Sequence, residues 1–134
     1  MEKPVLETAT LAFHDTGLLP QLQAAPDDVL DALNFGVIGF DTDGVVRRYN
    51  AWESRAAGLS LPRVIGHALF TVVAPCMNNF MVAQRFEDAA AVGEPLDAVI
   101  DYVLTLRMRP VKVKLRLLAQ PGQAMRYVLV ERPS

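Results

Sequence analysis

The strict alternation of apolar and charged residues from Val111 to Leu117 constrains the fold more than any other stretch of the chain. The run reads Val-Lys-Val-Lys-Leu-Arg-Leu. Successive side chains of an extended strand point to opposite faces, so the apolar residues share one face and the cations the other. This pattern is typical of an antiparallel sheet that packs one face on a core. We expect Lys112, Lys114 and Arg116 to form a solvated strand face.

The remaining segments predict an α+β domain. Four further β-prone runs cover residues 35–40, 45–49, 97–108 and 125–130. The first two are joined by Asp41-Thr42-Asp43-Gly44, which is a hairpin signal. Between the two halves of the sheet we expect short helices and one longer helix, from Asn78 or Asn79 to about Val92, with Phe80 and Phe86 on its buried face. The order predicts a five-stranded antiparallel sheet with helices on one face.

Residues 1–33 are predicted to form an N-terminal helical cap, and residues 34–134 the core domain. Pro20 and Pro26 interrupt the cap segment. A short helix is expected over 26–33, because acidic residues follow Pro26 in its first turn. Its apolar residues Val29, Leu30 and Leu33 would dock on the outer face of the sheet.

Composition excludes several classes of function. A chain of 134 residues suits one domain, and a net charge of -2 gives no electrostatic footprint for nucleic acid. No basic cluster or apolar leader indicates a membrane partner or export, and the longest uncharged run, 68–84, contains Pro75 and two asparagines. One cysteine rules out an internal disulfide and the usual zinc sites. We expect a cytoplasmic protein.

The stretch Tyr49-Asn50-Ala51-Trp52-Glu53 allows two interpretations. Asn50 is a good N-cap, and Glu53 three residues later completes a capping box. Alternatively, Tyr49 and Glu53, four residues apart, point into one pocket and share a ligand. A buried glutamate tends to stay protonated, because desolvation disfavours its charge. In that form Glu53 would donate a hydrogen bond.

Cys76 is the single cysteine and follows Val73-Ala74-Pro75. A lone cysteine is commonly a small buried apolar residue. We also expect a helix to begin within a few residues of it. A thiol near a helix N-terminus is biased toward the reactive thiolate.

Taken together, these stretches resemble the photoactive yellow protein family of light sensors with the PAS fold. The resemblance covers Asn34 to Val130. Its most specific parts are Tyr49-Asn50-Ala51 with Glu53, and Val73-Ala74-Pro75-Cys76 at the expected interval; Pro110-Val111-Lys112-Val113-Lys114 also matches. The resemblance implies a PAS fold over this region.

The resemblance also implies a chemistry. Cys76 would carry p-coumaric acid through a thioester, and Tyr49 and Glu53 would hold its phenolate. Phe70, Tyr102 and Met108 match positions that line or cover the family's pocket, although Phe70 and Met108 also suit an ordinary core. Light would isomerise the chromophore, Glu53 would transfer its proton, and the cap would loosen.

The implied function is blue-light reception without turnover, so we do not expect an enzyme. The signal would pass to a downstream protein that the sequence does not identify, and a homodimer is left open. The alternative is a pigment-free PAS module for ligand sensing or dimerisation. A thiol enzyme is disfavoured, because neither His14 nor His67 lies in a stretch matched to the pocket.

The chain departs from the family pattern near the pocket. Ala57 stands where the family has a threonine that bonds the tyrosine. Leu59 replaces an arginine and Leu104 a phenylalanine, while Trp52 replaces a small residue. These changes weaken the polar support around Tyr49 and Glu53.

Overall fold

A five-stranded antiparallel sheet forms the centre of the computed structural model, which describes residues 11–105 and 109–133. The strand order is β2-β1-β5-β4-β3, so the first and last strands of the sequence pair in the middle. The strands are β1 Gly36–Phe40, β2 Val46–Tyr49, β3 Leu96–Leu104, β4 Val111–Ala119 and β5 Arg126–Glu131. The expected α+β class and five-stranded PAS-type sheet are therefore confirmed.

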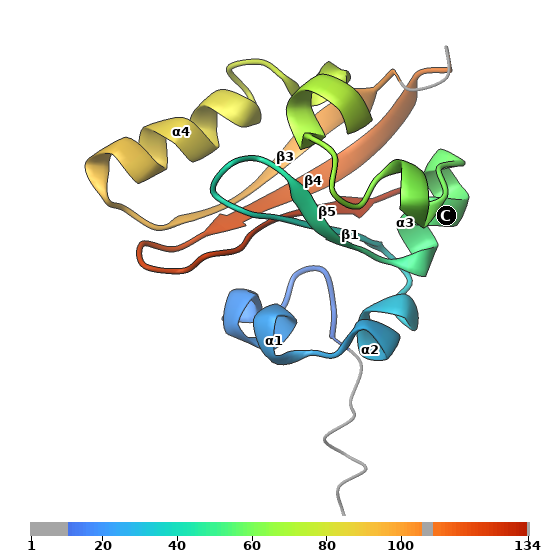
Figure 1. The fold of residues 1–134 in the computed structure, drawn as a ribbon, viewed down its shortest axis with the longest axis horizontal. Helices are drawn as coiled ribbons and strands as arrows, with labels where there is room; N and C mark the ends of the chain where they lie inside the picture. The colour runs from blue at the N-terminus through green and yellow to red at the C-terminus, as the bar shows by residue number, and fades with distance from the viewer. Residues whose placement is uncertain (1–10, 106–108, 134) are drawn as a thin grey trace, which may run out of the picture.

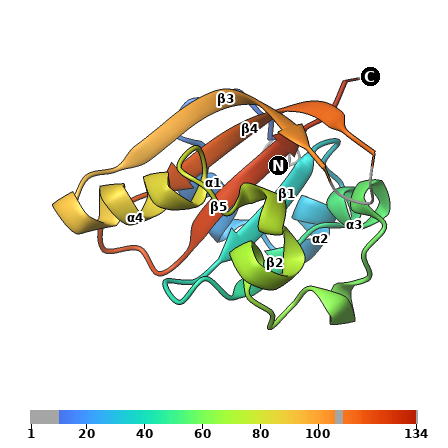
Figure 2. The ribbon, with the colours of Figure 1, turned by 90° about the horizontal axis from the view of Figure 1, so that it is seen from above.

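Helices lie on both sides of this sheet (Figure 1). The inner face carries α3 Ala51–Ala57, η2 Leu61–Arg63, η3 Leu69–Val73, η4 Pro75–Met77 and α4 Ala83–Val92. The outer face carries the cap helices α1 Leu18–Ala24 and α2 Asp27–Asp31. Figure 2 shows α3 and α4 at opposite ends of the sheet, with the short turns between them. None of the helices in the described ranges is long and apolar enough to cross a membrane.

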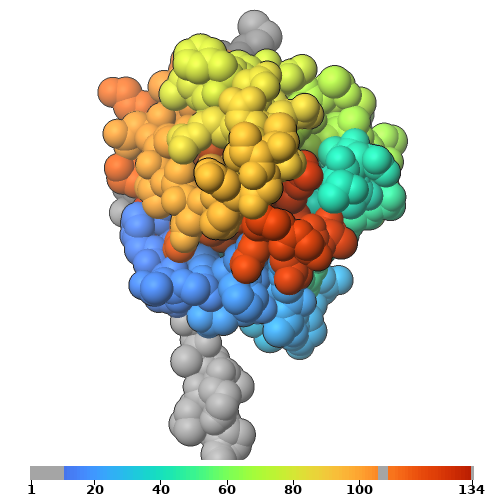
Figure 3. Space-filling view, turned by 90° about the vertical axis from the view of Figure 1, so that its left-hand side faces the viewer, coloured from blue at the N-terminus to red at the C-terminus, as the bar shows by residue number. Residues whose placement is uncertain are grey.

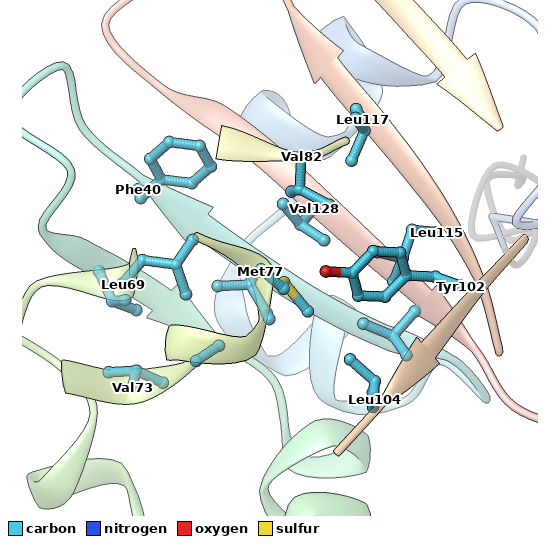
Figure 4. Packing of buried hydrophobic residues seen from close by; sticks show 14 of the residues in the cluster. Phe40, Leu69, Val73, Met77, Val82, Tyr102, Leu104, Leu115, Leu117 and Val128 are labelled. Carbon is cyan, nitrogen blue, oxygen red and sulfur yellow. The ribbon is translucent and has the colours of Figure 1, made fainter. Parts of the chain in front are cut away.

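The inner core consists of side chains from all five strands of the sheet, from the short turns and from α4. Leu115, Leu117 and Val128 are fully buried on the central strands (Figure 4). Phe40 packs edge-on against Phe86 of α4, with ring centres 5.0 Å apart. The alternation in β4 thus does direct its apolar residues inward, and α4 closes one end of this core.

The N-terminal cap packs on the outer face through a second apolar cluster. Leu18 and Leu22 of α1 are buried against Tyr127 and Leu129 of β5. In Figure 3 the cap and α4 lie on opposite sides of the β4–β5 turn. The predicted docking of the cap is confirmed, although Val29 is 39% exposed and does not take part.

One prediction about the cap was wrong in detail. Pro20 lies within the first turn of α1, where a proline sacrifices no intrahelical hydrogen bond, so it does not break the helix.

The prediction of a solvated cationic face on β4 was wrong for Arg116, which is only 5% exposed. Arg116 donates to the carbonyl oxygens of Phe13 and Asp15 at 2.8 and 2.7 Å and pairs with Asp97. The cationic face of β4 is therefore solvated only at its lysines.

The helix after Cys76 begins later than the sequence predicted. Before α4 starts at Ala83, the Asn79 side chain accepts hydrogen bonds from the backbone N–H groups of Met81 and Val82. Asn79 therefore caps a turn that precedes the helix. Phe80 lies in this turn and is 79% exposed, so its expected place on the buried face was wrong.

Candidate functional site

Tyr49 and Glu53 are brought together where β2 ends and α3 begins. Asn50 is the N-cap of α3, and its Oδ1 accepts the backbone N–H of Glu53 at 3.2 Å. Tyr49 is 7% exposed and Glu53 is 2% exposed. Only half of the expected capping box forms, because the Asn50 N–H donates to the Val37 carbonyl oxygen instead of to Glu53. The Glu53 carboxylate therefore makes no capping bond to the Asn50 backbone.

That carboxylate is bound by Arg132, which follows β5. Arg132 donates from Nη1 to Oε1 of Glu53 at 2.6 Å and from Nη2 to Oε2 at 3.0 Å. Burial raises the pKa of Glu53, and the guanidinium opposes that shift. This pair was not predicted, because Arg132 lies 79 positions away from Glu53, beyond the segment with a recognisable resemblance.

The charges of Glu53 and Arg132 also act on the Tyr49 hydroxyl. Burial raises the pKa of Tyr49 strongly, the nearby charge of Glu53 adds to the shift, and Arg132 counteracts it. The phenol therefore keeps its proton at neutral pH. Tyr49 is 7% exposed as a residue and lies next to the buried Glu53 carboxyl, so its phenol is placed where it can donate a hydrogen bond to a ligand.

Cys76 lies in η4, a three-residue turn on the inner face. Its thiol is free, half-buried, and packed against the inner core. The expected position at the N-terminus of a long helix was wrong, because α4 begins only at Ala83. Helix-dipole activation of this thiol thus has no support in the geometry.

The backbone of Cys76 is held by two side chains. Tyr102 of β3 donates from its hydroxyl to the Cys76 carbonyl oxygen at 2.5 Å. Asn79 donates from Nδ2 to the same oxygen at 3.2 Å and to the Tyr102 hydroxyl at 2.6 Å. Figure 4 shows the Tyr102 ring reaching from β3 toward Met77. Asn79 was expected only as a helix cap, and its part in fixing the Cys76 loop was missed.

The other residues singled out in the sequence have mainly structural surroundings. Phe70 is partly buried and meets Phe40 edge-on, with ring centres 5.5 Å apart. Leu104 is 2% exposed in the inner core. Met108 lies outside the described residues. Ala57 is buried on α3, which leaves no hydroxyl at that position.

An open cavity of about 1320 Å³ adjoins the partners of these residues, although Tyr49, Glu53 and Cys76 themselves are not among its described lining residues. Its wall includes Asn79 and Tyr102, which bind the Cys76 carbonyl, and Arg132, which binds Glu53. Trp52 also lines it and has a buried Nε1 with no hydrogen-bond acceptor in the part of the chain described. Among the described lining residues, the Tyr102 phenol, the Arg132 guanidinium and the Trp52 indole N–H are hydrogen-bond donors of the kind that suit a phenolic or anionic ligand.

The same residues do not suit a metal. In the described ranges, no three histidine, cysteine, aspartate or glutamate side chains gather where they could hold an ion. In their chemistry the residues do fit a phenolic thioester at Cys76, because Cys76 has a free thiol and a buried phenol and a buried carboxyl lie together at Tyr49 and Glu53. The cysteine, tyrosine and glutamate are chemically competent for attachment and for phenolate binding.

The chain matches a family model and is similar in sequence to known proteins. Residues 30–132 match the family model described as the PAS fold. The chain is 37% identical over 91 residues to the photoactive yellow protein of Rhodothalassium salexigens, which covers 68% of this chain and 72% of that protein. The family-model match, over residues 30–132, spans the sheet and the candidate site.

The fold is also similar to solved structures of this family and of other PAS domains. The photoactive yellow protein domain of the sensor histidine kinase Ppr from Rhodospirillum centenum superposes with a TM-score of 0.77 at 36% identity, covering 84% of this chain and 98% of that domain. The PAS domain of the RpfR quorum-sensing receptor from Cronobacter turicensis, in complex with C12:0, gives a TM-score of 0.59 at 16% identity, with 76% and 96% covered. That second likeness concerns the fold alone. The chain therefore belongs to the photoactive yellow protein family, within the proteins that share the PAS fold.

Proposed function

We propose that the protein is a blue-light photoreceptor that carries p-coumaric acid as a thioester on Cys76. The observation that most supports this is the burial of Tyr49 beside Glu53, where the charge of the Glu53 carboxyl acts on the Tyr49 phenol. A phenol and a carboxyl buried together can both hydrogen-bond to the phenolic oxygen of a ligand, which would be costly to bury without such partners. The stretch Val73-Ala74-Pro75-Cys76, which resembles the family's attachment motif, supplies the cysteine in this proposal.

In this proposal each residue has a separate task. The Cys76 sulfur forms the thioester, while Tyr102 and Asn79 fix the Cys76 carbonyl and so orient the loop. Tyr49 and Glu53 hold the phenolic oxygen through hydrogen bonds. The p-coumaroyl group would supply absorption of blue light and a double bond that light can isomerise. Phe70, Leu104 and, by the resemblance, Met108 exclude water from the pocket.

Glu53 would store the proton that turns light absorption into a signal. A protonated carboxyl donates a hydrogen bond to a phenolate, and loses that stabilisation when the acceptor moves away. Release of its proton then leaves a charge in a buried site, which favours local loosening. The first turn of α3 is bonded to the cap, because Ala51 donates its backbone N–H to Asp31 at 2.8 Å. Loosening at Glu53 thus reaches the N-terminal cap.

The signal would leave through the cap or the sheet to a downstream protein, and the protein itself would carry out no turnover. We place it in the cytoplasm. The signalling partner remains unidentified, and a homodimer is compatible with the proposal. The sensor-kinase context of one relative is a property of that protein, but it illustrates the class of partner that fits a signalling role.

A pigment-free PAS module for ligand sensing or dimerisation is the alternative function. One observation favours it: Glu53 is already neutralised within the chain by Arg132. Because the Arg132 guanidinium already neutralises the Glu53 carboxylate, the pocket does not need a phenolate to balance a buried charge. Colour after reconstitution separates the two functions, because only the photoreceptor turns yellow.

Intact mass tests the attachment directly. Incubation of the full chain with activated p-coumaric acid should add the mass of one chromophore, and Cys76→Ala should abolish the addition. The product should absorb blue light and bleach reversibly. Absence of labelling in the wild type, or equal labelling of Cys76→Ala, would refute the proposed function. Asn78→Ala is the matched control, since Asn78 is exposed nearby in the same loop.

A further inference from the structure

The contact between Arg132 and Glu53 has the geometry of an ionised pair. Two parallel N–H···O bonds of 2.6 and 3.0 Å join the guanidinium to the carboxylate. The Glu53 side chain is 2% exposed and that of Arg132 is 15% exposed, so solvent screens the pair weakly. A fork of this kind needs both carboxylate oxygens as acceptors and is among the strongest polar contacts in proteins.

Among the described residues, Arg132 is the cation that balances the charge of Glu53. The titratable groups that act on it among the described residues are Arg132 after β5 and Tyr49 at the end of β2. On β1 its neighbour is Gly36, which has no side chain, and a Cβ there would lie 2.0 Å from Oε1 of Glu53. The carboxylate therefore packs against bare backbone on one side and meets a single cation on the other.

We propose that Arg132 is the positioning residue that keeps Glu53 ionised before a pigment is attached, and that Glu53 takes up the proton that the pigment's phenol loses when it becomes a phenolate in the pocket. The second half rests on the proposed function; the first does not. One guanidinium balances one anion. A carboxylate and a phenolate together would leave one buried negative charge in excess, which is costly in a poorly solvated site. Protonation of Glu53 at a carboxylate oxygen removes the excess and turns an acceptor into the donor that a phenolate needs.

This assigns Arg132 a role that differs from simple stabilisation. Arg132 sets the protonation state of Glu53 before and after the pigment is attached. Its positive charge is balanced by the Glu53 carboxylate before attachment and by the phenolate afterwards. A neutral residue at 132 should leave a buried carboxyl with no cation, and such a group binds a proton. Arg132→Lys keeps a positive charge and should keep Glu53 ionised, although without the two-bond fork.

Infrared spectroscopy of the full chain without pigment tests the first half. The spectrum of the wild type minus that of Glu53→Gln, recorded at neutral pH, should contain no protonated-carboxyl stretching band. The same difference in an Arg132→Gln background should contain that band, and an Arg132→Lys background should lose it again. Arg55→Gln is the matched control, because Arg55 is exposed on the same helix as Glu53. A protonated-carboxyl band in the wild type, or its absence in Arg132→Gln, overturns the proposal.

Proton release tests the second half. Activated p-coumaric acid is added to weakly buffered protein with a pH indicator, and the wild type is compared with Arg132→Gln. The coupling chemistry is the same in both. In the wild type the phenolic proton passes to Glu53, whereas in the variant Glu53 already holds a proton and the phenolic proton is released, so the variant should release roughly one proton more per chromophore. Equal proton balances with full labelling would overturn the coupling. If no chromophore attaches to either protein, the proposed function fails, while the infrared comparison still decides whether Arg132 holds Glu53 ionised.

Discussion

Asn50 donates a hydrogen bond from Nδ2 to the carbonyl oxygen of Leu30 at 2.8 Å, and this bond joins the cap to the N-cap of the helix that carries Glu53. The same amide donates to the Phe35 carbonyl oxygen at 2.9 Å. Its Oδ1 accepts the backbone N–H groups of Val37 and Glu53. One buried side chain therefore connects the cap, the first strand and the candidate site.

We expect Asn50→Ala to destabilise the protein by about 2–4 kcal/mol, because it removes a helix cap and leaves buried donors and acceptors without partners. Asn50 is 1% exposed, so water does not replace these bonds. Urea unfolding measures the loss. Asn78→Ala, at an exposed position, should change the free energy of unfolding little. Similar stabilities for the two variants would mean that the amide network contributes little.

Arg116 is expected to hold the cap on the sheet. Arg116→Gln removes its bonds to the carbonyl oxygens of Phe13 and Asp15, which leaves those acceptors unpaired and weakens docking. Hydrogen exchange in residues 11–25 should become faster, by about tenfold for each 1.4 kcal/mol lost. Lys112→Gln, on the same face of β4 but exposed, is the control. Equal exchange in both variants would show that the apolar contacts alone retain the cap.

Local patterns predicted the elements of the fold well, because each one depends on neighbouring residues. The alternation in β4, the Asn50 cap and Gly58 at the end of α3 all formed as the sequence indicates. The start of α4 was mistaken, because either asparagine suits an N-cap and only the three-dimensional structure shows that Asn79 caps a separate turn. The burial of Arg116 was missed, since a pattern of alternation cannot show that a second layer covers the polar face.

The candidate site was only partly accessible from the sequence. The pairing of Tyr49 with Glu53 follows from their spacing at a strand-to-helix junction, and both are buried as expected. The partner of Glu53 does not follow from any local rule, because Arg132 meets it only after β5 has paired with β1. An arginine soon after a buried strand is common, and nothing in its neighbours distinguishes it from a solvated terminal residue.

Gly36 is expected to be required for the position of Glu53. A Cβ at residue 36 would lie 2.0 Å from Oε1 and 2.9 Å from Cδ of Glu53, and the buried carboxylate is held by Arg132 on its other side. Gly36→Ala should therefore break the pair and cost about 1–3 kcal/mol. Thermal unfolding measures this cost. In a Glu53→Ala background the same glycine substitution should cost much less. An equal cost in both backgrounds would place the conflict elsewhere.

The stabilising effect of Arg132 should depend on pH. Burial raises the pKa of Glu53 above its ordinary value of 4.5, and Arg132 limits the increase. The folded state thus binds the Glu53 proton more tightly than the unfolded state does. The stability from this proton is fully present below the unfolded pKa and is lost as pH rises through the folded pKa. Without Arg132 the folded pKa rises further, so the decline continues to higher pH.

We therefore expect Arg132→Gln to cost about 3 kcal/mol at pH 7, where it leaves a buried carboxyl without its cation, and clearly less near pH 4, where Glu53 gains a proton in both proteins. Urea unfolding at a series of pH values measures this difference. In a Glu53→Gln background the cost of Arg132→Gln should not change with pH across this range, because the titrating partner is absent. A cost that is independent of pH when Glu53 is present would show that the guanidinium acts through packing rather than through the charge of the carboxylate.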